Sequence, residues 1–346
     1  MRSDNDSVSI IVPAYNAAGT IEATIASVRA QTHANWEMLV VDDGSSDDTA
    51  ERVRNIALQD HRIRLVRQER RGPSAARNHG LAMAGGEYIA PIDADDLWHP
   101  RYLEAQLRTF RSEGAPPYSF VYSLHRQISP TNMVVSQLPC WGVCGRAYLR
   151  HVLLNFVGCG SAIVAPRIAV LDAGMYDVRA FEAGGAEDYR LQLRLASVGP
   201  VGFTRMALVG YRRGLDSYSA DPGRAMRSRL AALASEQGAL AEPASLAKWV
   251  TADAGRVAAL QSLRSDWRRA IPLLASSIAE DPEGAAGDIW ERITNRARPR
   301  TPPYGAQFFD VSPEADLSHP RNEVLVQRLE WLKAYESDPG TPRTTG

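Results

Sequence analysis

The fold is decided near the start of the chain, where Ser9-Ile10-Ile11-Val12-Pro13-Ala14-Tyr15-Asn16 leads into a stretch with helical spacing. Val8–Val12 is a short run rich in β-branched residues, which favours a buried strand. Thr20–Gln31 carries apolar residues on one helical face, and Met38–Val41 is an apolar run again. A strand, a helix and a second strand predict a β-α-β unit with parallel strands.

The same alternation continues as far as residue 110 and predicts an α/β fold. The further segments are Asp47–Leu58, Ile63–Val66, Ser74–Ala84, Tyr88–Ile92 and Tyr102–Phe110. Repeated units of this size indicate a doubly wound, mainly parallel sheet with helices on both faces. Ligands of such sheets bind beyond the carboxyl ends of the strands. Three polar clusters follow predicted strands at that edge: Pro13–Asn16, Asp42–Ser46 and Asp93–Asp96.

The second half of the chain is less regular and ends in a helical region. Its predicted elements are the strands Phe120–Leu124, Ala162–Ala165 and Ala207–Tyr211, and the helix Asp188–Val198. From about Leu215 the composition becomes rich in Ala, Leu, Arg and Glu, and the segments 246–263 and 266–282 resemble one tetratricopeptide-type helical hairpin. We therefore predict an α/β domain over 1–214 and a helical appendage over 215–300. Residues 301–346 are predicted to hold a linker, a last helix and a disordered tail.

Composition indicates an ordinary globular protein with no global attraction to nucleic acid. The 346 residues are 45% hydrophobic, and the formal net charge is −1. The odd count of three cysteines favours a reducing compartment, and we interpret them as buried thiols rather than a zinc site. The polar start Met1–Ser7 does not resemble a signal peptide, and no apolar run approaches the roughly 20 residues of a membrane span. We expect a cytoplasmic protein.

The acidic cluster Asp93-Ala94-Asp95-Asp96 is the strongest chemical signal. Three carboxylates within four positions after an apolar strand offer the hard oxygen ligands that Mg²⁺ or Mn²⁺ prefers. Such an ion neutralises charge on a departing diphosphate. An acidic surface turn is the alternative interpretation, and the position at the sheet edge argues against it.

The two preceding clusters offer groups for a nucleotide. Tyr15 presents an aromatic face on which a base can stack, although the ring could instead pack against the next helix. Asp42 and Asp43 could accept hydrogen bonds from a base or a ribose. A helix cap explains Asp47 but leaves the other two carboxylates without a structural reason.

Taken together, four motifs resemble those of the family 2 glycosyltransferases, which have a GT-A fold, and the resemblance covers roughly residues 8–212. The motifs are Ser9–Asn16, Val41–Thr49, Ala76-Arg77-Asn78-His79-Gly80 and Asp93–Trp98. The resemblance implies that Pro13 and Tyr15 hold the base of a nucleotide sugar, that Asn16 and Ala94 lie beside it, and that Asp43 accepts from the base. It further implies that Arg77 and Asn78 flank the nucleotide. Asp93 and Asp95 would form the Asp-x-Asp element, one toward the ribose and one on the metal, with Asp96 as a further candidate ligand.

An inverting transfer also needs a base for the acceptor hydroxyl. Glu187 and Asp188 begin a predicted helix, where acids are favourable in any case because of the helix dipole. By resemblance they match the family's Glu-Asp motif, with Asp188 as the base and Glu187 as the fallback. Arg212 and Arg213 resemble a segment that contacts the diphosphate, and solvated surface arginines are the alternative.

The expected activity is transfer of a sugar from a UDP-, dTDP- or GDP-linked donor to a hydroxyl of a glycan, a lipid-linked or a small-molecule acceptor. A nucleotidyltransferase is a second interpretation, but the segment after the first strand lacks the basic, glycine-rich loop. A binding module without catalysis is a third, and the intact acids argue against it. The sequence leaves two associations open: a peripheral one with a membrane surface, and a homodimer through the C-terminal helices.

Overall fold

The computed structural model confirms the alternating strands and helices of the first half of the chain. It describes residues 6–137, 140–180, 185–213, 222–236, 244–262, 267–286, 306–313 and 323–337. The first elements are β1 (Val8–Ala14), α1 (Ile21–Arg29), β2 (Trp36–Asp42), α2 (Thr49–Ala57), β3 (Ile63–Arg67), α3 (Pro73–Met83), β4 (Tyr88–Pro91), β5 (Leu97–Trp98) and α4 (Tyr102–Arg111).

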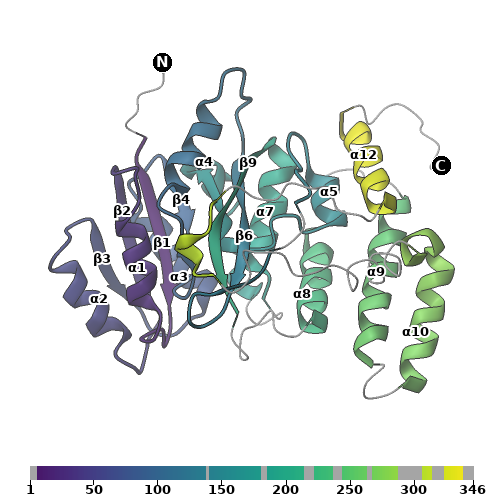
Figure 1. Cartoon of the computed structure of the whole chain (residues 1–346), viewed down its shortest axis with the longest axis horizontal. Coiled ribbons are helices and arrows are strands. Elements are labelled where there is room, and N and C mark those ends of the chain that lie inside the picture. The colour runs from purple at the N-terminus through teal and green to yellow at the C-terminus, as the bar shows by residue number, and fades with distance from the viewer. Residues whose placement is uncertain are drawn as a thin grey trace.

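The second half adds the remaining strands and then the C-terminal helices (Figure 1). These elements are β6 (Phe120–Ile128), β7 (Val134–Gln137), α5 (Tyr148–Leu153), η1 (Gly160–Ala162), β8 (Ile163–Pro166), α6 (Arg167–Asp172), α7 (Glu187–Val198) and β9 (Val201–Arg212). They are followed by α8 (Pro222–Ser235), α9 (Ala244–Ser262), α10 (Trp267–Glu280), η4 (Phe308–Asp310) and α12 (Glu323–Ser337).

The sheet has the strand order β3-β2-β1-β4-β8-β6-β9-β5, with β7 beside β6. β1 pairs in parallel with β2 and β4, and β2 pairs in parallel with β3, as the βαβ pattern predicts. β8 is antiparallel to both β4 and β6, so the sheet beyond β4 is mixed rather than mainly parallel. The expected parallel order therefore holds for the half of the sheet that is built from regular βαβ units.

The register of the parallel strands brings the polar clusters together. Ala14 at the end of β1 lies opposite Asp42 at the end of β2. The backbone N–H of Asp43 donates to the carbonyl of Ala14 at 2.8 Å, and that of Ile92 donates to the carbonyl of Ile11 at 3.0 Å. The residues that follow β1, β2 and β4 therefore leave the sheet at one edge, where a ligand site is expected.

The C-terminal helices pack on the far side of the α/β domain (Figure 1). α9 packs against α10, α8 against α7 and α9, and α12 against α5. A buried ion pair of 2.8 Å joins Arg150 of α5 to Glu336 of α12. A second buried set joins Arg256 of α9 and Arg328 of α12 to Asp281. Among the described residues, no helix is both long and apolar enough to cross a membrane.

The region 301–346 is more than a linker with a final helix. Its helix is present as α12, but residues 306–313 pack against the sheet of the α/β domain. The expected linker at 298–303 lies outside the described residues, and so do residues 338–346 of the expected tail 336–346, whose first two residues belong to α12. Of the three thiols, Cys140 and Cys159 are buried as expected, whereas Cys144 is exposed, and none forms a disulfide.

Candidate active site

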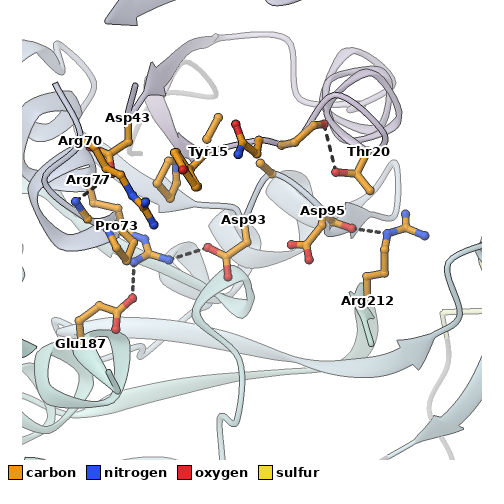
Figure 2. A pocket seen from close by; sticks show the side chains of 16 residues that line it. Tyr15, Thr20, Asp43, Arg70, Pro73, Arg77, Asp93, Asp95, Glu187 and Arg212 are labelled. Atoms are coloured by element: carbon orange, nitrogen blue, oxygen red, sulfur yellow. Dashed lines mark hydrogen bonds and ion pairs between the residues drawn. The ribbon is translucent and has the colours of Figure 1, made fainter. Parts of the chain in front are cut away.

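A pocket of about 720 Å³ lies at the edge where β1, β2 and β4 end (Figure 2). It also receives Glu187 from the start of α7 and Arg212 from the end of β9. Ten of the predicted site residues line it: Pro13, Tyr15, Asn16, Asp43, Arg77, Asp93, Ala94, Asp95, Glu187 and Arg212. Asn78, Asp96, Asp188 and Arg213 are not part of its wall.

Asn16 connects the first two polar clusters. Its backbone has a φ of 49°, a left-handed conformation that asparagine tolerates better than most residues. The backbone N–H of Asn16 donates to the Ser45 hydroxyl at 3.0 Å, and its side-chain oxygen accepts from the backbone N–H of Ser46 at 2.9 Å. Asn16 therefore ties the end of β1 to the loop after β2.

Asp43 is only 4% exposed and holds the loop that precedes α3. Its carboxylate accepts hydrogen bonds from the Gln68 side chain at 2.7 Å and from the backbone N–H groups of Arg71 and Gly72 at 2.8 Å. Gly72 has a φ of 88°, which a side chain would strain. One side of the carboxylate still faces the pocket. Asp43 is thus a loop anchor as well as a candidate contact to the base.

Tyr15 is 39% exposed and lines the pocket. The guanidinium of Arg70 lies over it, 4.0 Å from the ring centroid, as a cation–π pair. Figure 2 shows both side chains pointing into the pocket. Arg70 thus covers one face of the Tyr15 ring, so a planar ligand would stack on the opposite face or take the place of Arg70. Our sequence analysis missed Arg70, although two arginines directly before Gly72-Pro73 at a helix start were a visible signal.

Arg77 lies in the pocket between the acidic loop Asp93–Asp96 and helix α7. Arg77 is only 5% exposed. Its guanidinium donates hydrogen bonds to Asp93 at 2.5 Å and to Glu187 at 2.8 Å. Burial disfavours the charge, but the carboxylates of Asp93 and Glu187 outweigh it and raise the pKa of Arg77 well above its usual range. The expected nucleotide contact of Arg77 is thus accompanied by a structural one, a bridge between two acids.

Asp93 and Asp95 both face the pocket, and they are the described acids that could hold a divalent ion there. Burial, followed by the nearby Asp93 carboxylate, raises the pKa of Asp95 to about 6. A cation bound between them would relieve this repulsion. The described residues contain no group of three or more His, Cys, Asp or Glu side chains arranged for a metal, so substrate oxygens would have to complete the ligand set.

Asp96 does not belong to that metal pair, contrary to our expectation. Asp96 is fully buried and does not line the pocket. Its carboxylate accepts from the Ser161 hydroxyl at 2.6 Å and from the backbone N–H of Arg212 at 2.9 Å. Burial, followed by the neighbouring Asp95 and Asp93, raises the pKa of Asp96 well above its usual range. The third acid of the cluster is therefore a structural group beneath the loop.

Arg212 reaches the pocket, but carbonyl groups engage most of its guanidinium. It donates to the backbone oxygen of Asp95 at 2.7 Å and to those of Ser129 and Pro130 at 3.0 and 2.9 Å. Its primary role in this structure is to hold the acidic loop. Arg213 points to Gln127, at 3.3 Å, and lies outside the pocket wall.

Asp188 lies at the first turn of α7, beside Glu187. Burial, followed by the adjacent Glu187 carboxylate, raises the pKa of Asp188 to about 6. One of its oxygens accepts from the backbone N–H of Tyr189 at 2.7 Å. The other lies beside Gly160, where an added Cβ would be 3.3 Å away.

The side chain of Asn78 is engaged by Tyr176, with whose backbone it exchanges two hydrogen bonds.

Comparison with known proteins decides the family. The glycosyl transferase family 2 pattern matches residues 9–132, from β1 into the β6–β7 turn. The UDP-Glc:alpha-D-GlcNAc-diphosphoundecaprenol beta-1,3-glucosyltransferase WfgD of Escherichia coli is 37% identical over 193 residues, which are 56% of this chain and 70% of that protein. The chain is a family 2 glycosyltransferase. This membership sets aside the nucleotidyltransferase and the non-catalytic module as interpretations.

Other relatives match shorter parts of this glycosyltransferase. The putative teichuronic acid biosynthesis glycosyltransferase TuaG of Bacillus subtilis is 43% identical over 122 residues, which are 35% of this chain and 48% of that protein. The chain thus matches about half of the length of that relative.

Solved structures confirm the GT-A fold of the glycosyltransferase. Residues 1–349 of Staphylococcus aureus TarS in complex with UDP-GlcNAc superpose with a TM-score of 0.59 at 15% identity, over 94% of this chain and 92% of that one. The mannosyltransferase PcManGT of Pyrobaculum calidifontis, in complex with GDP-Man and Mn²⁺, gives 0.56 at 18% identity, over 97% and 88%. At these identities the likeness establishes the fold.

Proposed function

We propose that this glycosyltransferase moves a sugar from a nucleoside diphosphate to an acceptor hydroxyl with inversion, assisted by a divalent metal ion. The observation that carries the proposal is the single pocket in which the ends of β1, β2 and β4 meet the first turn of α7. Such a transfer needs three parts. They are an aromatic ring for the base, a pair of acids for the metal ion and diphosphate, and a further acid that accepts the proton of the acceptor hydroxyl.

The base of the donor is assigned to the end of the pocket with Tyr15, Arg70 and Asp43. The ring and the guanidinium offer flat faces for stacking, and the buried carboxylate offers an acceptor for a base N–H. WfgD is named for UDP-Glc, and TarS was solved with UDP-GlcNAc. We therefore propose a UDP-sugar as the donor.

The diphosphate is assigned to the side of the pocket with Asp93 and Asp95, where Mn²⁺ or Mg²⁺ would be held chiefly by Asp95. The pKa of Asp95 is raised by burial and then by the nearby Asp93 carboxylate, and a cation bound beside the two carboxylates would offset both effects. When bound, such an ion neutralises the charge that develops on the departing diphosphate. PcManGT, of the same fold, was solved with Mn²⁺.

Asp188 is assigned as the base that accepts the proton of the acceptor hydroxyl. Glu187 is a poor alternative because its carboxylate is engaged in an ion pair with the buried Arg77 guanidinium. Asp188 has a pKa of about 6, which suits a base at neutral pH, and one of its oxygens carries no hydrogen bond from the described residues. Its position outside the pocket wall requires the acceptor to enter from the side of α7.

The acceptor is proposed to be a hydroxyl of a glycan or of a lipid-linked sugar in polysaccharide synthesis. WfgD acts on a diphosphoundecaprenol-linked sugar, and TuaG is assigned to teichuronic acid biosynthesis. Three unpaired thiols favour a reducing, cytoplasmic compartment. Peripheral membrane association and dimerisation stay predictions, to be checked by vesicle sedimentation and by light scattering.

Thermal unfolding with UDP, dTDP, GDP and their sugars, each with and without Mn²⁺, tests the donor. A ligand that binds the folded state stabilises it by RT ln(1 + [L]/Kd), so at equal concentrations UDP and a UDP-sugar should give the largest, metal-dependent rise in Tm. A larger rise with GDP would overturn the assignment of the base. NMR of the product should show an inverted anomeric centre, and a retained centre would overturn the assignment of Asp188.

A further inference from the structure

Residues 306–313 return from the helical region to the α/β domain. This return segment is the yellow-green stretch that crosses the middle of the molecule in Figure 1, far from α10 and α12. The backbone N–H of Val134 donates to the carbonyl of Ala306, and that of Phe308 donates to the carbonyl of Asn132, both at 2.9 Å. At the other end, the N–H of Ala207 donates to the carbonyl of Pro313 at 2.8 Å. The segment thus spans from the β6–β7 turn to β9.

Phe308 is the side chain by which the return segment enters the fold. It is 1% exposed and forms a small apolar core with Leu97, Ile128 and Val134, separate from the main core. Its ring also fills the space over Gly210, where an added Cβ would lie 3.2 Å from the ring. The absence of a side chain at Gly210 therefore admits Phe308.

This small core lies directly behind the acidic loop. Leu97 follows Asp96 in sequence and pairs with Gly210 across the antiparallel β5–β9 ladder. Two residues beyond Gly210, Arg212 donates its backbone N–H to the Asp96 carboxylate at 2.9 Å and its side chain to the carbonyl of Asp95 at 2.7 Å. The same pair of strands thus contacts Phe308 at Gly210 and carries, two residues further along β9, both anchors of the loop.

We propose that Phe308 is a positioning residue for the donor site: it holds the β5–β9 pair and, through it, the acidic loop Asp93–Asp96. β5 has only two residues and few ladder bonds, so the packing of Leu97 against Phe308 adds to the contacts that hold β5 beside β9. Removal of the Phe308 ring leaves a cavity behind Leu97 into which the strand can relax. The inference rests on the proposed function in one respect, the assignment of the diphosphate and metal to this loop.

The loss of Phe308 is expected to affect the two ends of the pocket differently. The end with Tyr15 and Asp43 is held by β1, β2 and the loop before α3, and none of these supplies a residue to the small core around Phe308, against which Ala23 of α1 packs. Loss of Phe308 should therefore disturb the acidic loop and leave the base end in place. A residue with a general stabilising role would weaken both ends alike.

The test uses three single-residue variants of the full chain. They are Phe308→Ala, the conservative Phe308→Leu, and Phe309→Ala as a control. Phe309 is the neighbouring aromatic residue, but it is 46% exposed. Hydrogen exchange is followed at the amides of Asp96 and Arg212 on the loop side, and of Asp43 and Gly72 on the base side. Phe308→Ala should accelerate exchange about tenfold or more at the first pair and leave the second pair unchanged. Phe308→Leu should show a smaller change, and Phe309→Ala none.

Calorimetry with UDP supplies the functional readout. In Phe308→Ala, the gain in UDP affinity on addition of Mn²⁺ should fall about tenfold, the scale expected for a small misplacement of ligands, while affinity without metal stays constant. If wild type shows no such gain, the metal assignment fails, and exchange alone decides the positioning role. Equal acceleration at both ends of the pocket, or no acceleration at either, would overturn it. If Phe308→Ala does not fold, Phe308→Leu is judged by the same contrast.

Discussion

The side chain of Arg77 donates a hydrogen bond of 2.8 Å to the carboxylate of Glu187, 110 residues later in the sequence. This contact separates the roles of two adjacent acids. Glu187 is paired with a buried guanidinium, whereas burial, followed by the adjacent Glu187 carboxylate, raises the pKa of its neighbour Asp188 to about 6. The structure thus favours the second acid of the pair as the proton acceptor.

Asp188→Asn should therefore leave donor binding intact and lower turnover by roughly 10²–10⁴, the usual contribution of a general base. The matched control is Glu187→Gln, which removes a neighbouring acid of the same helix turn. Glu187→Gln should retain more turnover than Asp188→Asn. Initial rates and UDP calorimetry on both variants check this, and the reverse order of turnover would reassign the base to Glu187.

The stability of the fold should carry the signature of Asp188 as well. Its pKa is about 6 in the folded protein and 3.8 unfolded, so the folded state binds the proton more tightly. The contribution of this group to stability is consequently present below about pH 4 and is lost as pH rises through 6. Asp188→Asn should raise Tm at pH 7.5 and leave it nearly unchanged at pH 4. Thermal unfolding at both pH values measures this, and an equal change at both would contradict the raised pKa.

Asp95→Ala should abolish the metal-dependent part of UDP binding, because the remaining Asp93 is paired with Arg77 and cannot hold the ion alone. Asp48→Ala is the control, an exposed acid whose side chain makes no capping hydrogen bond. Calorimetry with UDP and Mn²⁺ compares the variants. An unchanged metal-dependent affinity in Asp95→Ala would remove this residue from the metal site.

Tyr15→Ala should weaken UDP binding by about 1–3 kcal/mol if the base stacks on the ring, and Arg70→Ala should also change it. Arg62→Ala is the control, since Arg62 lies over Trp36 at 3.8 Å in the same type of pair but outside the pocket. Because Tyr15 is 39% exposed, its loss should barely lower Tm. A variant that melts much lower yet binds UDP normally would make Tyr15 a packing residue.

Glu336→Ala should destabilise the protein by about 3–5 kcal/mol, since it leaves Arg150 buried without its partner charge. Glu330→Ala on the same helix should cost less than about 1 kcal/mol, because its pair with Lys333 is exposed. Urea unfolding measures both, and UDP affinity should be unchanged in each. A marked loss of affinity in Glu336→Ala would connect α12 to the donor site.

The sequence alone was sufficient to predict the first half of the fold. Apart from the two-residue strand β5, the helices and strands up to α4 follow from apolar periodicity, which depends only on neighbours in the chain. The pocket edge followed too, because parallel strands place their carboxyl ends together. This is why Tyr15, Asp43, Asp93 and Asp95 could be singled out and are found side by side in one pocket.

The tertiary structure decided how the acids divide their work, because burial and pairing depend on residues far apart in the sequence. Spacing made Asp96 look equivalent to Asp95, but contacts with Ser161 and Arg212 turn it into the interior. Nothing near Phe308 in the sequence connects it to the donor loop. Its role arises because the chain folds back over Gly210, where the missing side chain leaves room for one aromatic ring.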